Sequence, residues 1–83
     1  NHWRLFPNPA SEQLYLQLSG EPQHDAPIKL QLIDARGKRL RSWHEAFPTT
    51  ERLPIDISEL PVGMYFLQID QAGKQQTLKL FKR

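Results

Sequence analysis

The 83-residue sequence contains no cysteine, so it can have neither a disulfide framework nor a cysteine-based metal site. It also lacks long apolar runs, and its mean hydropathy of -0.61 excludes a membrane-spanning helix. No window shows an apolar stripe of helical period. No basic and apolar leader is present, so we expect any signal peptide of the parent protein to lie upstream. A domain of this size must therefore be stabilised by its hydrophobic core alone.

Motifs for catalysis and for metal binding are also missing. The three histidines are scattered without metal-ligand spacing, and the aspartates do not form a calcium-binding run. Neither Gly-Lys pair has the upstream glycine of a phosphate-binding loop, and no serine has the context of a nucleophile. We therefore predict a domain that is not an enzyme, has no cofactor and has no small-molecule substrate.

Charge is modest, with a formal net value of +2 and a charged fraction of 24%. This is far below the Lys and Arg content of a nucleic-acid-binding domain, so we expect no nucleic-acid partner. Basic residues do cluster at 36–41 and again at 79–83. Such clusters are typical of solvated strand edges, but they could also form a docking surface for an acidic partner.

Alternation of apolar and polar residues is the dominant pattern, and it is typical of strands with one buried face. The clearest segments are 14–18, 28–32, 53–57, 65–69 and 78–80, and weaker ones near 3–6 and 40–43 bring the count to about seven. Short strands at this spacing predict an all-β sandwich, with a small closed barrel as the structural alternative.

Two turns share the pattern Asp-x-x-Gly-Lys, at Asp34-Ala35-Arg36-Gly37-Lys38 and at residues 70–74. Aspartate can accept hydrogen bonds from a turning backbone, and glycine adopts the positive φ that closes a hairpin. We therefore predict hairpins that pair residues 28–34 with 39–44 and residues 64–70 with 75–81. The segment 20–27 is expected to be a polar loop, and residues 48–50 mark another break.

A less common motif, Phe6-Pro7-Asn8-Pro9-Ala10, precedes the first strong strand. Each proline fixes its own φ and restricts the residue before it, so the motif predicts a rigid turn. Residues 60–67 form a second motif, Leu60-Pro61-Val62-Gly63-Met64-Tyr65-Phe66-Leu67, in which a turn with glycine leads into a tyrosine-bearing strand.

In their order along residues 5–83, these motifs together resemble the C-terminal sorting domain, type A, of the bacterial type IX secretion system. The residues that carry the resemblance, and that we regard as candidate recognition residues, are Pro7, Asn8, Pro9, Gly37, Lys38, Leu60, Pro61, Gly63, Tyr65, Lys79, Lys82 and Arg83.

The resemblance implies a single domain over residues 1–83, with 1–4 as a linker remnant, folded as an immunoglobulin-like antiparallel β-sandwich of about seven strands. It also implies a place in an exported protein of the Bacteroidetes, which crosses the periplasm and reaches the outer membrane, the cell surface or the medium. The implied partners are the outer-membrane components of the type IX machinery and a sortase-like peptidase.

Four apolar residues are out of phase with the buried positions of their strands, so we expect them to face outward as a possible interaction patch. They are Tyr15, Met64, Phe66 and Phe81. The alternative is that a loop or a sheet edge covers them. We also expect the last strand to be the least covered part of the domain.

Two other functions fit the same composition. A generic immunoglobulin-like or fibronectin-like module for adhesion or carbohydrate binding would be favoured by a flat, exposed aromatic row, for which Trp3 and Trp43 are candidates. Alternatively, the domain could be a spacer beside an upstream catalytic domain.

Overall fold

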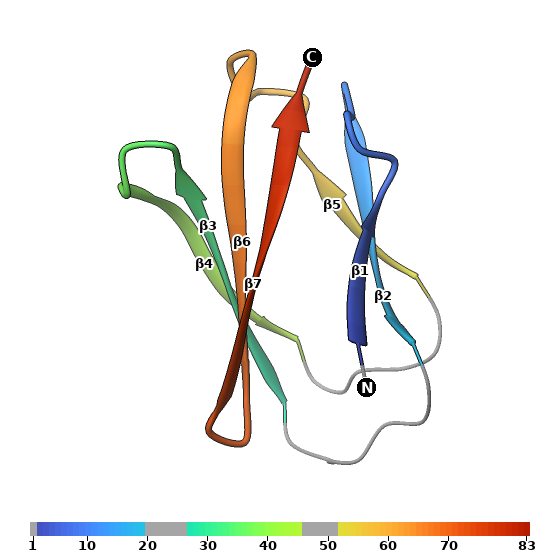
Figure 1. The fold of residues 1–83 in the computed structure, drawn as a ribbon, viewed down its shortest axis with the longest axis vertical. Helices are drawn as coiled ribbons and strands as arrows, with labels where there is room; N and C mark the ends of the chain where they lie inside the picture. The colour runs from blue at the N-terminus through green and yellow to red at the C-terminus, as the bar shows by residue number, and fades with distance from the viewer. Residues whose placement is uncertain (1, 20–26, 46–51) are drawn as a thin grey trace.

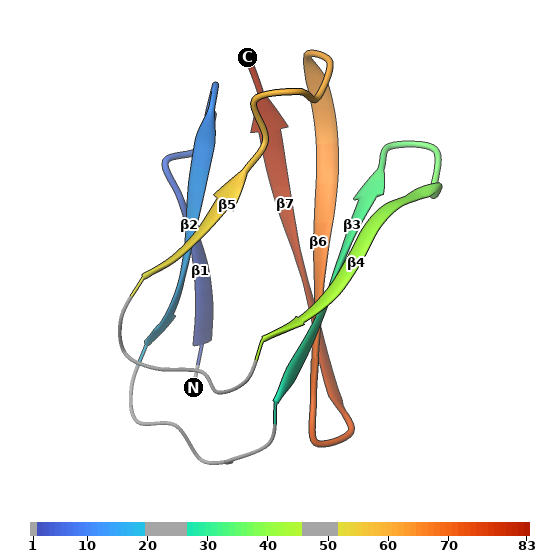
Figure 2. The same ribbon diagram turned by 180° about the vertical axis from the view of Figure 1, so that it is seen from behind.

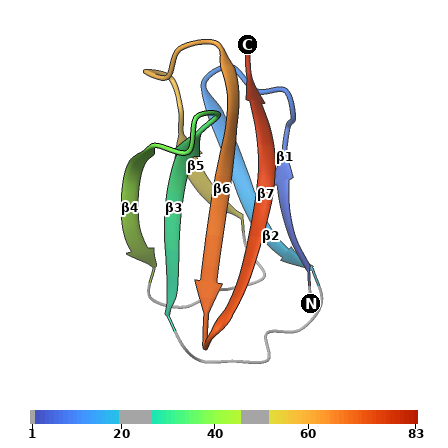
Figure 3. The ribbon, with the colours of Figure 1, turned by 60° about the vertical axis from the view of Figure 1, so that its left-hand side comes forward.

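Seven strands in two antiparallel sheets make up the computed structural model, which describes residues 2–19, 27–45 and 52–83. One sheet has the order β1-β2-β5 and contains β1 (His2–Phe6), β2 (Gln13–Ser19) and β5 (Leu53–Asp56). The other has the order β4-β3-β6-β7 and contains β3 (Ile28–Asp34), β4 (Arg39–Glu45), β6 (Gly63–Gln71) and β7 (Lys74–Lys82). The sheets face each other as separate layers (Figures 1 and 3), which confirms the predicted sandwich over the closed barrel.

The strand order is that of an immunoglobulin-like domain. If the seven strands are equated with A, B, C, C′, E, F and G, the sheets read A-B-E and C′-C-F-G. The chain therefore crosses between the sheets after β2, after β4 and after β5. The first and last strands, β1 and β7, also contact each other between the two sheets. No described helix is long and apolar enough to cross a membrane.

The core lies between the two sheets and is filled by the alternating positions of both. Its largest fully buried side chains are Leu14, Leu16, Ile28, Leu30, Leu32, Ile57, Leu67, Ile69 and Leu80. Each of them contributes about 2 kcal/mol through removal of apolar surface from water. Trp3 and Trp43 are half-buried and pack against this core. They therefore do not form the flat aromatic row that would favour an adhesion or carbohydrate-binding module.

The N-terminal strand begins earlier than the sequence suggested. β1 pairs with β2 from His2 opposite Ser19 to Phe6 opposite Tyr15. Residues 2–4, which we interpreted as part of a linker remnant, are thus hydrogen-bonded into the sandwich. Most of the polar loop at 20–27, and the break at 48–50, lie outside the described residues.

Both expected hairpins are present, but their turns differ. In the first, Asp34 accepts hydrogen bonds from the backbone N–H groups of Arg36 and Lys38, each at 2.9 Å, and Gly37 has a φ of 91°. In the second, Gln71 pairs with Lys74 around a two-residue loop in which Ala72 has a φ of 50° and Gly73 a φ of 81°. Positive φ at both central residues defines a type I′ turn.

The shared Asp-x-x-Gly-Lys pattern therefore does not produce one shared structure. Asp70 accepts a hydrogen bond from the side-chain amide of Gln75 at 3.0 Å. The two turns differ because the pairing of β3 with β4 shifts register between Leu32 and Ile33. That shift leaves Leu40 as the extra residue of a β-bulge, and a bulge redirects a side chain away from the regular alternation.

Replacing Gly37 or Gly73 with valine should cost more than about 1 kcal/mol in the free energy of unfolding, because a β-branched residue is strained at positive φ. An added Cβ would meet nothing within 4 Å at either position, so the cost arises from the backbone alone. Chemical denaturation of each variant would measure it.

The control for that experiment is Ala72→Asn, which creates the Asn-Gly pair that suits a type I′ turn and should stabilise the domain. If both valine variants unfolded at the wild-type midpoint, the positive φ values would have no energetic consequence and the interpretation would be wrong.

Candidate functional site

The Pro7-Asn8-Pro9 turn is hydrogen-bonded directly to the last strand. The Asn8 side chain donates from Nδ2 to the carbonyl of Lys79 at 3.0 Å, and its Oδ1 accepts from the N–H of Phe81 at 2.9 Å. One primary amide therefore satisfies an acceptor and a donor on the free edge of β7, as a neighbouring strand would. The two flanking prolines restrict the backbone on both sides of Asn8, which limits the conformations open to this side chain.

Ala10 extends the same contact along β7. Its N–H donates to the carbonyl of Phe81 at 2.9 Å, and its own carbonyl accepts from the N–H of Arg83 at 2.9 Å. Ala10 also forms a parallel bridge with Lys82 and is 1% exposed. We call this set of contacts, from Asn8 and Ala10 to the backbone of residues 79–83, the edge clamp.

The edge clamp overturns one expectation from the sequence. The last strand is not the least covered part of the domain, because Leu80 is 1% exposed and the edge of residues 79–83 is hydrogen-bonded to Asn8 and Ala10. Charged side chains remain accessible here, since Lys79 and Arg83 are exposed and Lys82 is half-buried. Any partner that contacts residues 79–83 therefore meets side chains rather than a bare backbone edge.

Tyr65 organises the loop that precedes β6. Its ring is buried, at 5% exposure, and its hydroxyl donates a hydrogen bond of 2.6 Å to the carbonyl of Pro61. A tyrosine near the start of the equivalent strand, bonded to backbone a few residues upstream, is a feature of immunoglobulin-like sandwiches known as the tyrosine corner. The bond fixes the path of Pro61, Val62 and Gly63 over the end of the core.

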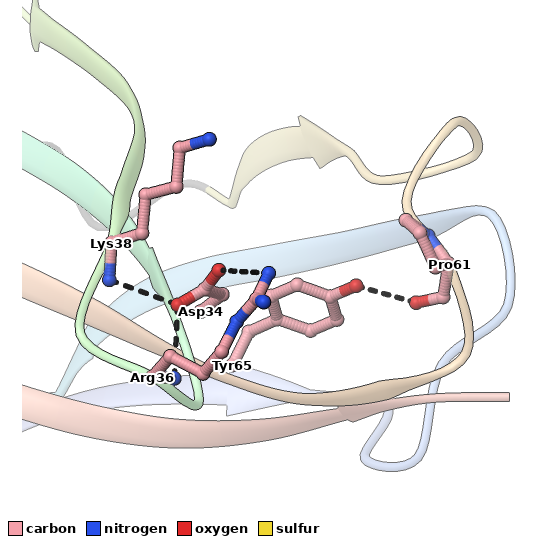
Figure 4. A network of polar contacts seen from close by, with 5 residues as sticks. All are labelled: Asp34, Arg36, Lys38, Pro61 and Tyr65. Atoms are coloured by element: carbon pink, nitrogen blue, oxygen red, sulfur yellow. Dashed lines mark hydrogen bonds and ion pairs between the residues drawn. The ribbon is translucent and has the colours of Figure 1, made fainter.

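Beside this loop lies the turn between β3 and β4, as Figure 4 shows. The Asp34 carboxylate accepts the two backbone hydrogen bonds of the turn and also forms an ion pair with Arg36 at 3.6 Å. These contacts, the N–H of Lys38 foremost, hold the pKa of Asp34 below its ordinary value. The carboxylate is therefore ionised at neutral pH and stabilises the turn.

The Asp34 turn and the Pro61 loop enclose a groove of about 320 Å³ at one end of the sandwich. We call it the end groove. Its lining residues are Asp34, Ala35, Arg36, Leu40, Pro61, Val62, Gly63, Met64 and Tyr65. Leu40 and Val62 are 40% and 78% exposed, so the groove presents two large apolar side chains to a partner. The side chain of Arg36, another lining residue, is 87% exposed, so the groove combines apolar side chains with an accessible positive charge.

The expected patch is divided between the two sheets. Met64 and Phe81 are cross-strand partners on β6 and β7, with Lys79 Nζ 5.9 Å from the Phe81 ring centroid, and Phe66 follows on the same outer face. Tyr15 lies on the other sheet, opposite Phe6. Three of the four residues therefore lie together, and Met64 connects them to the end groove.

Folding brings the sequence motifs to one end of the molecule. The β1–β2 turn, the β3–β4 turn, the β5–β6 loop and the end of β7 all lie at the same end (Figures 1 and 2). Sequence reasoning missed Ala10, Leu40 and Val62. An available signal for Val62 was its apolar side chain within a Pro-Val-Gly turn, where polar residues are usual. Among the described residues no cluster of His, Asp and Glu could hold a metal ion.

Comparison with known proteins adds two findings. The sequence profile of a family described as "Secretion system C-terminal sorting domain" matches residues 4–83. The protein named karilysin, from Tannerella forsythia, is 29% identical over 85 residues, a match that covers 95% of this chain. The match covers 18% of karilysin, so this chain spans less than a fifth of the length of that relative.

Proposed function

This chain belongs to the family of secretion-system C-terminal sorting domains and is a type IX secretion sorting signal, and we propose that the machinery reads it at the end groove. A sorting signal acts by being bound, and members of this family are not catalytic. Its function therefore depends on which residues the fold presents together on the surface.

The observation that carries the proposal is the convergence of separate motifs at one end. Gly37 and Lys38 belong to the turn on one side of the groove, while Pro61, Gly63 and Tyr65 belong to the loop on the other side. The edge clamp joins Asn8 to the strand that pairs with Gly63. An unfolded chain would present these residues far apart, so a partner that binds all of them reads the folded domain.

The partner in this proposal is an outer-membrane component of the type IX machinery. It would insert an apolar side chain between Leu40 and Val62, and an acidic group would lie near Arg36. The cargo would cross the periplasm before this step, and a sortase-like peptidase would act on the domain afterwards. The final location of the cargo would be the cell surface or the medium.

Val62→Asp should strongly reduce sorting without unfolding the domain. Val62 is 78% exposed, so an aspartate there costs little stability but introduces a charge into an apolar contact. The domain would be fused to the C-terminus of a periplasmic reporter in a host with an intact type IX apparatus. Surface reporter should fall by about tenfold or more, which corresponds to about 1.4 kcal/mol of binding free energy.

The matched control is Thr77→Asp, which places the same charge at an exposed position of β7 away from the groove. It should be exported like wild type. A strain without the apparatus should retain every fusion in the periplasm. If wild type were displayed equally in both strains, the fusion would not depend on this machinery, and if Val62→Asp were exported normally, the end groove would not be the surface that is read.

A further inference from the structure

The outer face of the three-stranded sheet carries a stack of aromatic rings and guanidinium groups. Phe6 and Tyr15 are cross-strand partners whose ring centroids lie 6.0 Å apart with an interplanar angle of 32°. The Arg52 guanidinium carbon lies 5.3 Å from the Phe6 centroid and 5.8 Å from that of Tyr15. Arg4 lies 5.6 Å from the Phe6 centroid. We call these four residues the arginine–aromatic face.

Their position on the surface follows from the strand alternation. Leu14 and Leu16 on β2, and Ile55 on β5, are buried in the core. The residues that alternate with them on each strand therefore point to the opposite side of the sheet. Arg4 and Arg52 are exposed, whereas Phe6 and Tyr15 are half-buried beneath them. The rings therefore act as a platform that holds the guanidinium groups in place.

Two positive charges share this platform, and no described carboxylate is paired with either of them. Among the described residues the ion pair is that of Arg36 with Asp34, and neither Arg4 nor Arg52 has a carboxylate within ion-pair distance. Like charges around one ring repel each other. A guanidinium held over an aromatic ring can still direct N–H donors that are not already bonded toward an oxyanion. The face is thus prepared for an anionic group.

Neutral hydrogen-bonding groups surround the charges. The Tyr15 hydroxyl donates to Gln13 Oε1 at 3.3 Å, and Arg4 Nη2 donates to Gln17 Oε1 at 3.5 Å. The backbone of β2, at the centre of this face, is paired with β1 on one side and β5 on the other, so it is not free to pair with a peptide strand. Such a face suits a ligand that carries oxyanions next to hydroxyl groups.

We infer that the arginine–aromatic face binds an acidic polysaccharide, with Arg4 and Arg52 contacting its carboxylate or sulfate groups. This site lies on the other sheet from Phe66 and Phe81 and does not depend on the sorting function. A sugar polymer fits this exposed sheet face because successive charged units can contact the two arginines, while the side chain of Gln13 can contact the hydroxyl groups.

The test is titration of the isolated domain with polygalacturonate and with dextran sulfate, followed by the NMR shifts of its backbone amides. Shifts should concentrate on β1, β2 and β5, and neutral dextran should cause none. The double substitution Arg4→Lys with Arg52→Lys keeps the net charge but loses the planar donors. It should weaken binding by about tenfold or more.

A matched control, Arg39→Gln with Lys74→Gln, removes two exposed charges from the four-stranded sheet and should bind like wild type. Thermal unfolding of each variant would establish that it is folded. Absence of binding to both acidic polymers would overturn the inference. So would equal loss in the control pair, full binding by the double lysine variant, or equally tight binding of poly-glutamate, which would indicate general charge attraction.

Discussion

Deleting residues 79–83 should unfold the domain rather than only remove a recognition element. The deletion removes Leu80, which is 1% exposed, together with the pairing of residues 79–82 with β6. Truncating one buried leucine typically costs about 2–5 kcal/mol, against a total stability of about 5–15 kcal/mol for a domain. The edge clamp is lost as well, because residues 79–83, to which Asn8 and Ala10 are bonded, are absent.

Circular dichroism and chemical denaturation would check this expectation, with Lys82→Gln plus Arg83→Gln as the control. That pair changes the charge of the tail but keeps the Leu80 side chain and the backbone bonds, so its stability should remain within about 0.5 kcal/mol of wild type. A truncated domain with a wild-type unfolding transition would contradict the prediction. The comparison also matters for sorting, since an export defect of the truncation alone would not separate lost folding from lost recognition.

Asn8→Ala should produce the second large effect, a loss of about 1–3 kcal/mol in the free energy of unfolding, because two hydrogen bonds are removed together. Both bonds are made by one side-chain amide, to the carbonyl of Lys79 and to the N–H of Phe81. Hydrogen exchange at the Phe81 amide should accelerate beyond the global change, since the strand edge would be open to water.

The near-isosteric control is Asn8→Asp. Its carboxylate can still accept from the N–H of Phe81, but it places a negative oxygen opposite the carbonyl of Lys79, where the native amide donates. We therefore expect it to be at least as destabilising as alanine at neutral pH, whereas Ser11→Ala, at an exposed neighbouring position, should have little effect. Unchanged exchange at Phe81 in both Asn8 variants would show that the clamp contributes nothing to the edge of β7.

The sequence alone determined which positions are buried in most strands. Alternation placed Leu14, Leu30 and Leu67 in the core and Phe66 on the outside, because strand geometry fixes the side-chain period whatever the strand pairs with. The two hairpins were also predictable, since glycine at Gly37 and Gly73 supplies the positive φ that a tight reversal needs. Membership of the sorting-domain family could also be inferred from the sequence, because each motif is a short local segment and the order of the motifs is read directly along the chain.

Only the tertiary structure decided how these local elements meet. Asn8 and Lys79 are 71 positions apart, and no local pattern indicates that the Asn8 side chain will hydrogen-bond to the backbone edge of β7. Tyr15 and Phe66 are both out of phase with the core, yet they lie on different sheets. Alternation specifies the face of a strand but not the sheet it joins, because sheet membership depends on pairing energies between segments distant in sequence.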